Sequence, residues 1–431
     1  MSHSTQFAHR VHERQAGPCH LLVLPTPVDG FVSWRGSFLA FPNLGDGDDL
    51  LQHLVVSLLD KGTTKRDRFE LARVLEDRGA SLRLSSDGLY VDVAGQALQD
   101  DLPAVMDVLA EMLIKPAFDP KEFEKAKAQT MARLQRQMEK TGTQASAALS
   151  RSLFPANHPN YNAPTQAQME RLQALSLEAV RAYHAHHFGA REWTLCMVGD
   201  ADPDAIESIV SEALGEWPPH DVSETHATDP RHAEPEQTAV PMPDKSNIDV
   251  RMGHALPLRR DHDDYLPLYV GNYILGGNFS ARLMNQVRDE KGLTYHIGSR
   301  LSGMSTRYAG SWTIQVTLSQ ETLVEGMEAT RSVVEQFVAE GATAEELSAK
   351  KTTITGSFTV GLATTQRLAQ SLLTNAERGF DVGYLDRFPN EIEALSLEAV
   401  NDAVQTYLHP EALHTACAGM LPENMERLHE G

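Results

Sequence analysis

The sequence predicts an α+β protein made of two duplicated domains, each a mainly antiparallel sheet covered by helices. The first observation is a repeat: residues 174–180 and 394–400 both read Ala-Leu-Ser-Leu-Glu-Ala-Val, 220 positions apart in a chain of 431 residues. Each copy leads through a helical pattern into a short apolar stretch containing Thr-x-Cys, at residues 193–199 and 414–419. The second observation is that strand-like and helix-like segments alternate within each half. Both observations indicate internal duplication rather than low complexity.

The elements of the first half are predicted in chain order. Segments 19–24 and 31–39 are rich in β-branched and aromatic residues and are predicted to form paired strands. A buried helix is expected over residues 48–60, with Asp48 or Asp49 as its N-cap, because leucine and valine cover most of its circumference. A long helix is expected from Asp119 to about Met138, because Asp119 is followed by proline and then by glutamate three positions on. Ser176 and Ser396 are predicted N-caps of equivalent helices.

A segment rich in proline and charge separates the two halves. It spans residues 217–245 and contains almost no large apolar side chain, so it is predicted to be an extended linker. The predicted domains are residues 1–216 and 246–431, in a clamshell arrangement that encloses a space.

Composition restricts the possible partners and the compartment. Fifty-nine acidic and 38 basic side chains give a formal charge of −21, which disfavours nucleic acid and anionic membranes as partners. No stretch of 18 uninterrupted apolar residues occurs, and the first ten residues lack an apolar core typical of a signal peptide. The expected location is the cytoplasm. Cys19, Cys196 and Cys417 lie apart in or beside apolar runs, so buried free thiols are expected.

A histidine on the buried helix carries the first functional motif. His53 precedes Lys61-Gly-Thr63, and this stretch resembles the zinc helix of the M16 (pitrilysin-like, inverzincin) metallopeptidases, whose His-x-x-Glu-His motif precedes a similar Lys-Gly-Thr. In this chain the positions of the family's general base and second ligand are Val56 and Ser57. Valine cannot accept a proton, and serine is a poor zinc ligand.

The family's third ligand is a glutamate on a later helix, and the alignment places Arg133 at that position. No acidic residue lies between Lys125 and Met138, so a small shift of register cannot supply one. The sequence therefore predicts no metal in this chain, with His53, Val56, Ser57 and Arg133 as degenerate positions.

The second half keeps other elements of the family. Residues 275–283 (Leu-Gly-Gly-Asn-Phe-Ser-Ala-Arg-Leu) are similar to its Leu-Gly-Gly-x-x-Ser-Ser-Arg-Leu segment, which includes Gly276, Gly277 and Ser280. Residues 288–295 match its Arg-x-x-x-Gly-Leu-x-Tyr element at every fixed position. Arginine offers a rigid fork of donors to a carbonyl or carboxylate, and a tyrosine hydroxyl can donate to an oxyanion. The resemblance implies that Gly276, Gly277, Ser280, Arg288 and Tyr295 bind substrate.

The resemblance implies a division of labour between two chains. In some bacterial M16 peptidases one chain supplies zinc and the other supplies the arginine and the tyrosine. This chain is predicted to be the second kind, without a cofactor of its own. It would bind an extended peptide and donate Arg288 and Tyr295 to a partner M16 subunit with an intact His-x-x-Glu-His and zinc, in a heterodimer or larger assembly.

Two alternatives stay open. One is a structural or peptide-binding M16 homologue without a catalytic role. The other, weaker one is a homodimer with a metal site drawn from His184, His186 and His187, although histidines at a helix C-terminus are also favoured by the helix dipole. For the bound peptide, the acidic charge favours a basic sequence if that charge lines the enclosed space.

Overall fold

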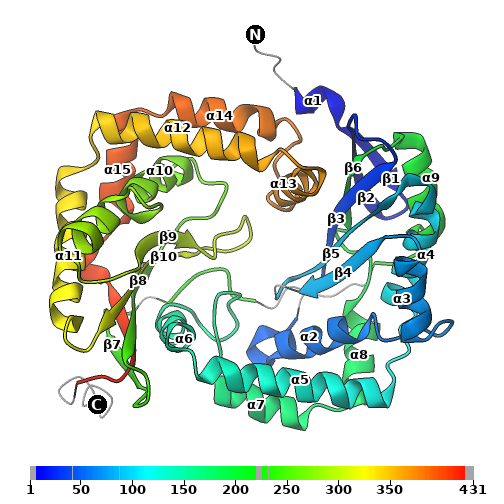
Figure 1. The fold of residues 1–431 in the computed structure, drawn as a ribbon, viewed down its shortest axis with the longest axis horizontal. Coiled ribbons are helices and arrows are strands. Elements are labelled where there is room, and N and C mark those ends of the chain that lie inside the picture. The colour runs from blue at the N-terminus through cyan, green and yellow to red at the C-terminus, as the bar shows by residue number, and fades with distance from the viewer. Residues whose placement is uncertain (1–5, 41, 87, 220–225, 232, 423–431) are drawn as a thin grey trace. The chain divides into compact units, whose positions relative to one another are not determined.

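The computed structural model describes residues 6–40, 42–86, 88–219, 226–231 and 233–422 (Figure 1). The chain divides into two compact units. The first unit combines Met1–Ala132, Gln168–His226 and Ser357–Asn390, and the second combines Arg133–Ala167, Ala227–Gly356 and Glu391–Gly431. Each unit contains one sheet and several helices, which confirms the predicted α+β class with two helix-covered sheets.

The first unit is built on a six-stranded sheet in the order β1-β2-β6-β3-β5-β4. Its strands are β1 (His12–Ala16), β2 (Cys19–Pro25), β3 (Phe31–Leu39), β4 (Ser81–Ser86), β5 (Tyr90–Leu98) and β6 (Thr194–Gly199). Neighbouring strands are antiparallel except for β2 and β6, which are parallel. The predicted direct pairing of segments 19–24 and 31–39 is wrong, because β6 lies between β2 and β3. β6 is buried along almost its whole length, which favours a position with a partner strand on both sides.

The second unit is built on a five-stranded sheet in the order β7-β11-β8-β10-β9. Its strands are β7 (Gln237–Pro241), β8 (Asn247–Ala255), β9 (Ile297–Ser302), β10 (Ser311–Ser319) and β11 (His414–Gly419). Only β11 and β7 are parallel among the described pairs of this sheet. β7 lies inside the segment that composition marks as a linker, and its Ala239 is buried beside Cys417. β9 forms one edge of the sheet.

The helices have the following bounds: α1 (Phe7–Arg10), α2 (Asp48–Leu58), α3 (Arg68–Glu76), α4 (Leu102–Ile114), α5 (Pro120–Met138), α6 (Thr141–Leu153), α7 (Thr165–Ala174), α8 (Leu177–His187), α9 (Pro203–Leu214), α10 (Tyr265–Gly276), α11 (Leu323–Glu340), α12 (Ala344–Gly361), α13 (Thr365–Glu377), α14 (Tyr384–Ala394) and α15 (Leu397–Tyr407). Short 3₁₀ turns cover Leu44–Asp46, Gln99–Asp101 and Pro410–Ala412, and a π-helical turn, η3, covers Met284–Glu290. In the part of the chain that the structure describes, none of the helices is long and apolar enough to cross a membrane.

Three of the four helix N-caps predicted from the sequence are present in the structure. Ser176 and Ser396 accept hydrogen bonds from Ala179 N–H and Ala399 N–H at the starts of α8 and α15. Asp119 accepts from two backbone N–H groups at the start of α5. The cap predicted for α2 is wrong: Gly47, with φ of 77°, is the N-cap, and the Asp48 carboxylate instead accepts from Asn43 N–H.

The duplication is visible in matched elements of the two halves. α6 and α13 are both 13 residues long, α8 and α15 both 11, and β6 and β11 both 6. A pair of hydrogen bonds from a lysine side chain is also repeated. Lys127 Nζ donates to the carbonyls of Gln173 and Leu175, and Lys351 Nζ donates to those of Glu393 and Leu395.

Each compact unit contains a helix from the other half of the sequence. In the first unit, α13 packs against β3 and β6, where Leu368, Leu372 and Leu373 join a core with residues of β2 and β6 (Figure 1). In the second unit, α6 packs against β8 and β11, and Leu149 and Leu153 join a core with Ala416 (Figure 1). Each sheet is built from strands of one half of the sequence, whereas each compact unit combines segments of both halves.

Candidate functional site

The helix that resembles the zinc helix is α2, and it carries His53, Val56 and Ser57 at the positions where the family places its metal chemistry. His53 is half-buried, and Val56 is only 6% exposed. Ser57 is half-buried, and its Oγ donates to Leu54 O of its own helix at 2.7 Å. The side chain at the position of the general base is therefore hydrocarbon, and the one at the second ligand position is bonded to the backbone.

Arg133, at the position of the third ligand, lies on α5. Burial lowers the pKa of its guanidinium, but arginine keeps its charge in proteins and offers no lone pair to a metal. This donor set does not fit zinc, since one imidazole is present where the family needs two imidazoles and a carboxylate. Among the described residues, no group of three or more His, Cys, Asp and Glu side chains is placed to hold a metal ion.

The three histidines at the end of α8 bond to different carbonyl groups. His184 Nε2 lies 2.8 Å from Leu113 O, His186 Nδ1 lies 2.7 Å from Ala182 O, and His187 Nδ1 lies 2.9 Å from Ala40 O. These contacts occupy one nitrogen of each ring, and among the described residues the three histidines do not form a group placed to hold a metal ion.

Arg288 and Tyr295 line the same cavity of the second unit, with a volume of about 680 Å³. Arg288 lies on η3, and its Nη1 is 2.9 Å from the exposed carboxylate of Asp289. Tyr295 is 95% exposed and lies in the loop before β9. Its hydroxyl has no hydrogen-bond partner among the described residues.

The loop that presents Tyr295 is fixed by hydrogen bonds of the preceding residue, Thr294. Thr294 Oγ1 donates to Thr317 O at 2.6 Å and accepts from His296 N–H at 3.1 Å. Gly292 adopts a φ of +65°, a conformation that favours glycine, where the chain leaves η3. π-Helical turns are often found at functional sites. The exposure of Tyr295 thus comes from an anchored loop.

Gly276 is the last residue of α10, Gly277 and Ser280 follow it, and each of the three has a structural role. A Cβ on Gly276 would lie 2.5 Å from Ser299 N, and one on Gly277 would lie 2.7 Å from Tyr273 Cα. Ser280 Oγ accepts from Lys350 Nζ at 2.7 Å. The two glycines also line a cavity of about 470 Å³, together with Phe279, which is 80% exposed.

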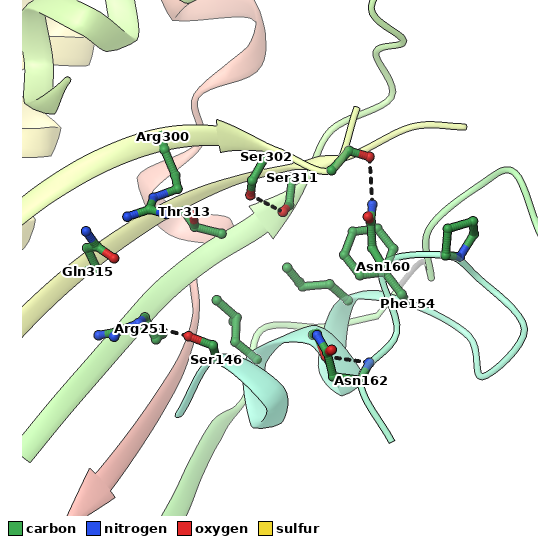
Figure 2. Close-up of a pocket in the computed structure, with 15 residues that line it drawn as sticks. Ser146, Phe154, Asn160, Asn162, Arg251, Arg300, Ser302, Ser311, Thr313 and Gln315 are labelled. Atoms are coloured by element: carbon green, nitrogen blue, oxygen red, sulfur yellow. Dashed lines mark hydrogen bonds between the residues drawn. The ribbon is translucent and has the colours of Figure 1, made fainter. Parts of the chain in front are cut away.

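A third cavity, of about 320 Å³, is drawn in Figure 2, and its lining includes residues of β9. The first two cavities share His296, and the last two share Arg300 and Gln315. Arg251, Arg300 and Gln315 are not among the functional residues predicted from the sequence. A signal was present, because every second residue of β10 is polar from Ser311 to Ser319 while the residues between them are buried and apolar.

Comparison with known proteins assigns the family. Residues 51–161 match the family model described as Insulinase (Peptidase family M16), and residues 174–354 match the one described as Peptidase M16 inactive domain. This chain belongs to peptidase family M16.

Relatives and solved structures match over most of the chain. The chain is 24% identical over 366 residues to the protein named Non-peptidase homolog YmxG of Helicobacter pylori, covering 85% of this chain and 83% of that protein. It is 24% identical over 365 residues to the protein of Bacillus subtilis named Uncharacterized zinc protease YmxG, covering 81% of this chain and 84% of that one. A crystal structure described as the peptidase M16 inactive domain from Pseudomonas fluorescens superposes with a TM-score of 0.83 at 23% identity, over 95% of this chain and 97% of that one. At these identities the structural likeness establishes the fold.

Proposed function

We propose that this chain is the subunit without zinc in a two-chain M16 peptidase, and that it supplies Arg288 and Tyr295 to the active site of a zinc-bearing partner. The observation that carries the proposal is that both side chains border one cavity, with Tyr295 95% exposed. The positions that correspond to the zinc site carry Val56, Ser57 and Arg133. A chain of this kind needs another subunit to supply the metal and the general base.

The ion pair of Arg288 leaves the guanidinium available to a substrate. Its partner Asp289 is exposed, and exposed ion pairs contribute only about 0–1 kcal/mol. A substrate carbonyl or carboxylate can therefore displace Asp289 at low cost. Tyr295 needs no displacement, because its hydroxyl faces solvent, where it can donate to an oxygen that gains charge during amide hydrolysis.

An extended peptide is the substrate that fits the surroundings of these residues. β9 is an edge strand, so one side of its backbone is available for pairing with another strand. The 470 Å³ cavity lined by Gly276 and by residues of β9 offers room for side chains of a paired peptide. Residence in the cytoplasm and a zinc ion in the partner remain predictions from the sequence and the family resemblance.

The first experiment is affinity isolation of the tagged chain from its own cells, with mass spectrometry of the proteins that co-purify. The expected result is a stoichiometric M16 chain with an intact His-x-x-Glu-His. The purified chain alone should cleave no peptide, and its mixture with that partner should. Peptidase activity of the lone, metal-free chain would overturn the proposal.

Substitution of the two residues tests their role in the mixture. Arg288→Ala or Tyr295→Phe should each lower kcat by roughly 10²-fold, as expected for loss of one oxyanion donor. Arg259→Ala and Tyr265→Phe are matched controls, since neither residue lines the three cavities along β9, and they should leave kcat unchanged. Equal activity of all four variants would remove the catalytic role.

A catalytically inactive structural or peptide-binding homologue is the second candidate. The observation that favours it is the relative from Helicobacter pylori that is named a non-peptidase homolog. Under this alternative the chain is recovered alone or only with itself, and peptide binding is retained while no mixture cleaves.

A further inference from the structure

One face of the second sheet gathers polar side chains beneath α6. In the register of the strands, Gln315 of β10 lies opposite Arg251 of β8, and Thr313 lies opposite Arg300 of β9. Residues directly opposite each other on neighbouring strands point to the same face, so the two arginines share it. Figure 2 shows Arg251, Arg300, Thr313 and Gln315 at one end of the 320 Å³ cavity and Phe154 at the other.

Arg251 is held in place by hydrogen bonds to Asp249 and to Ser146, which also lines the cavity. Its Nη1 donates to Asp249 Oδ1 at 3.2 Å and its Nε to Ser146 Oγ at 3.1 Å. Asp249 also accepts hydrogen bonds from Thr141 and Thr317, so its carboxylate is shared among three donors. Burial lowers the pKa of Arg251, Asp249 opposes this shift, and the positive charge of Arg300 adds to it.

Arg300 has no carboxylate to balance its charge. It makes no hydrogen bond or ion pair within the part of the chain that the structure describes, although its charge is close enough to act on Arg251. None of the 15 described residues that line the cavity is acidic. In a chain with a net charge of −21, this leaves two arginines and no carboxylate in the lining, with Arg300 exposed and Arg251 paired with Asp249. An anion placed between the two guanidinium groups relieves their mutual repulsion.

The opposite end of the cavity combines apolar side chains with the polar side chains of Asn160 and Asn162 (Figure 2). The apolar side chains belong to α6 and the segment that follows it: Leu149, Leu153, Phe154 and Pro159. A volume of about 320 Å³ lies at the lower end of the range for small-molecule sites, so the cavity fits one or two amino-acid residues and not an extended chain. Hydroxyl groups of Ser302 and Ser311 lie between the two ends (Figure 2).

We infer that this cavity is a binding site for a small organic carboxylate with an apolar group next to its charge, such as the C-terminal residue of a short peptide. Arg300 and Arg251 bind the carboxylate, and the apolar side chains at the opposite end bind the side chain of the ligand. Arginine suits this task, because its planar fork matches the two carboxylate oxygens. The site needs neither a zinc-bearing partner nor Arg288 and Tyr295, so the inference goes beyond the proposed function.

Calorimetric titration of the full-length chain alone tests the site. The probes are N-acetyl-leucyl-leucine with a free carboxylate, the same dipeptide as its C-terminal amide, and inorganic phosphate at equal ionic strength. The free acid should bind with a Kd on the order of 0.1 mM, as expected for a ligand of this size. The amide and phosphate should each bind at least about 10-fold more weakly, because the first lacks the charge and the second lacks the apolar group.

Two variants locate the binding in this cavity. Arg300→Gln should weaken binding of the acid by about 10-fold or more and leave binding of the amide unchanged. Arg259→Gln, an exposed arginine of the same unit that does not line the cavity, should bind the acid like the wild type. Thermal unfolding of both variants checks that they are folded.

Four outcomes would each overturn the inference: equal affinity for acid and amide, equal affinity for phosphate and acid, undetectable binding of the acid, or no effect of Arg300→Gln. Because no cleavage is measured, these outcomes leave the proposed peptidase function untouched.

Discussion

His254 is a buried histidine whose neutral form is fixed by its two hydrogen bonds. Its Nδ1 lies 2.8 Å from Ala255 O, which can only accept, so Nδ1 carries the proton. Its Nε2 accepts from His409 N–H at 3.1 Å and must therefore be unprotonated. Burial lowers the pKa of His254 to about 4, and the neighbouring His409 contributes to the shift. Protonation of Nε2 would break the bond to His409.

This geometry predicts a loss of stability at mildly acidic pH. The unfolded chain binds a proton at His254 below about pH 6.5, whereas the folded chain does so only below about pH 4, so stability falls as the pH drops through this window. The expected loss at this site is up to about 3 kcal/mol. Urea unfolding of wild type and His254→Gln at several pH values measures it, and the free-energy difference between them should change between pH 6.5 and 4. His186→Gln, at an exposed position, is the control; the same pH dependence in both variants would contradict the prediction.

The residues predicted to be functional also show how residue-scale chemistry and packing combine. Tyr295 is exposed because Thr294 fixes the loop on both sides of it, and Arg288 is available because its partner Asp289 faces solvent. At Val56 and Ser57 the side chains instead complete the packing of α2. Tyr295 is thus exposed and Arg288 partly exposed, whereas Val56 is buried and Ser57 is half-buried and bonded to its own helix.

At the scale of elements, the close contact of α10 with β9 shapes the turn at Gly276 and Gly277. A buried network ties the two elements: Asn272 Nδ2 donates to Ser299 O at 3.2 Å, and Trp312 Nε1 donates to Ser299 Oγ at 2.7 Å. This network requires α10 to approach β9 so closely that no Cβ fits at Gly276. The glycine pair of the family motif therefore has a structural reason in this chain besides its predicted role in substrate binding.

Alanine substitutions separate packing from intrinsic helix preference. Gly276→Ala should lower the free energy of unfolding by about 2 kcal/mol or more, because the new methyl group overlaps Ser299. Gly356→Ala is the matched control, since it lies in helix α12 with no atom within 4 Å of its Cβ position. It should raise stability by about 0.5–1 kcal/mol. Denaturant unfolding of both variants measures these values; an equal effect at the two positions would exclude the close contact.

At the scale of the whole molecule, the exchanged helices make the two halves of the sequence depend on each other. The first sheet needs α13 from the second half to cover Leu22, Leu24 and Val198. The second sheet needs α6 from the first half to cover Ala416. Each half alone would leave an apolar sheet face open to water.

Fragment complementation tests this dependence. Residues 1–245 and 246–431, produced separately, should each lack a cooperative thermal transition, while co-expression should restore one transition and a soluble complex. Circular dichroism and size-exclusion chromatography measure both. Cooperative unfolding of either fragment by itself would mean that its sheet does not need the exchanged helix. The full-length chain is the control.

Local sequence determined much of this protein. The repeated heptapeptide, the apolar strand segments and the capped helix at Asp119 predicted elements that the structure contains, because periodicity and capping act between residues close in sequence. The valine at position 56, where the resemblance places the family's general base, was also visible directly. Tertiary structure alone decided that β6 separates β2 from β3, that α6 and α13 are exchanged, and that Arg251 and Arg300 share one cavity. Strand order, helix exchange and strand register depend on contacts between distant segments, and no local pattern specifies which distant partner a strand or helix will meet.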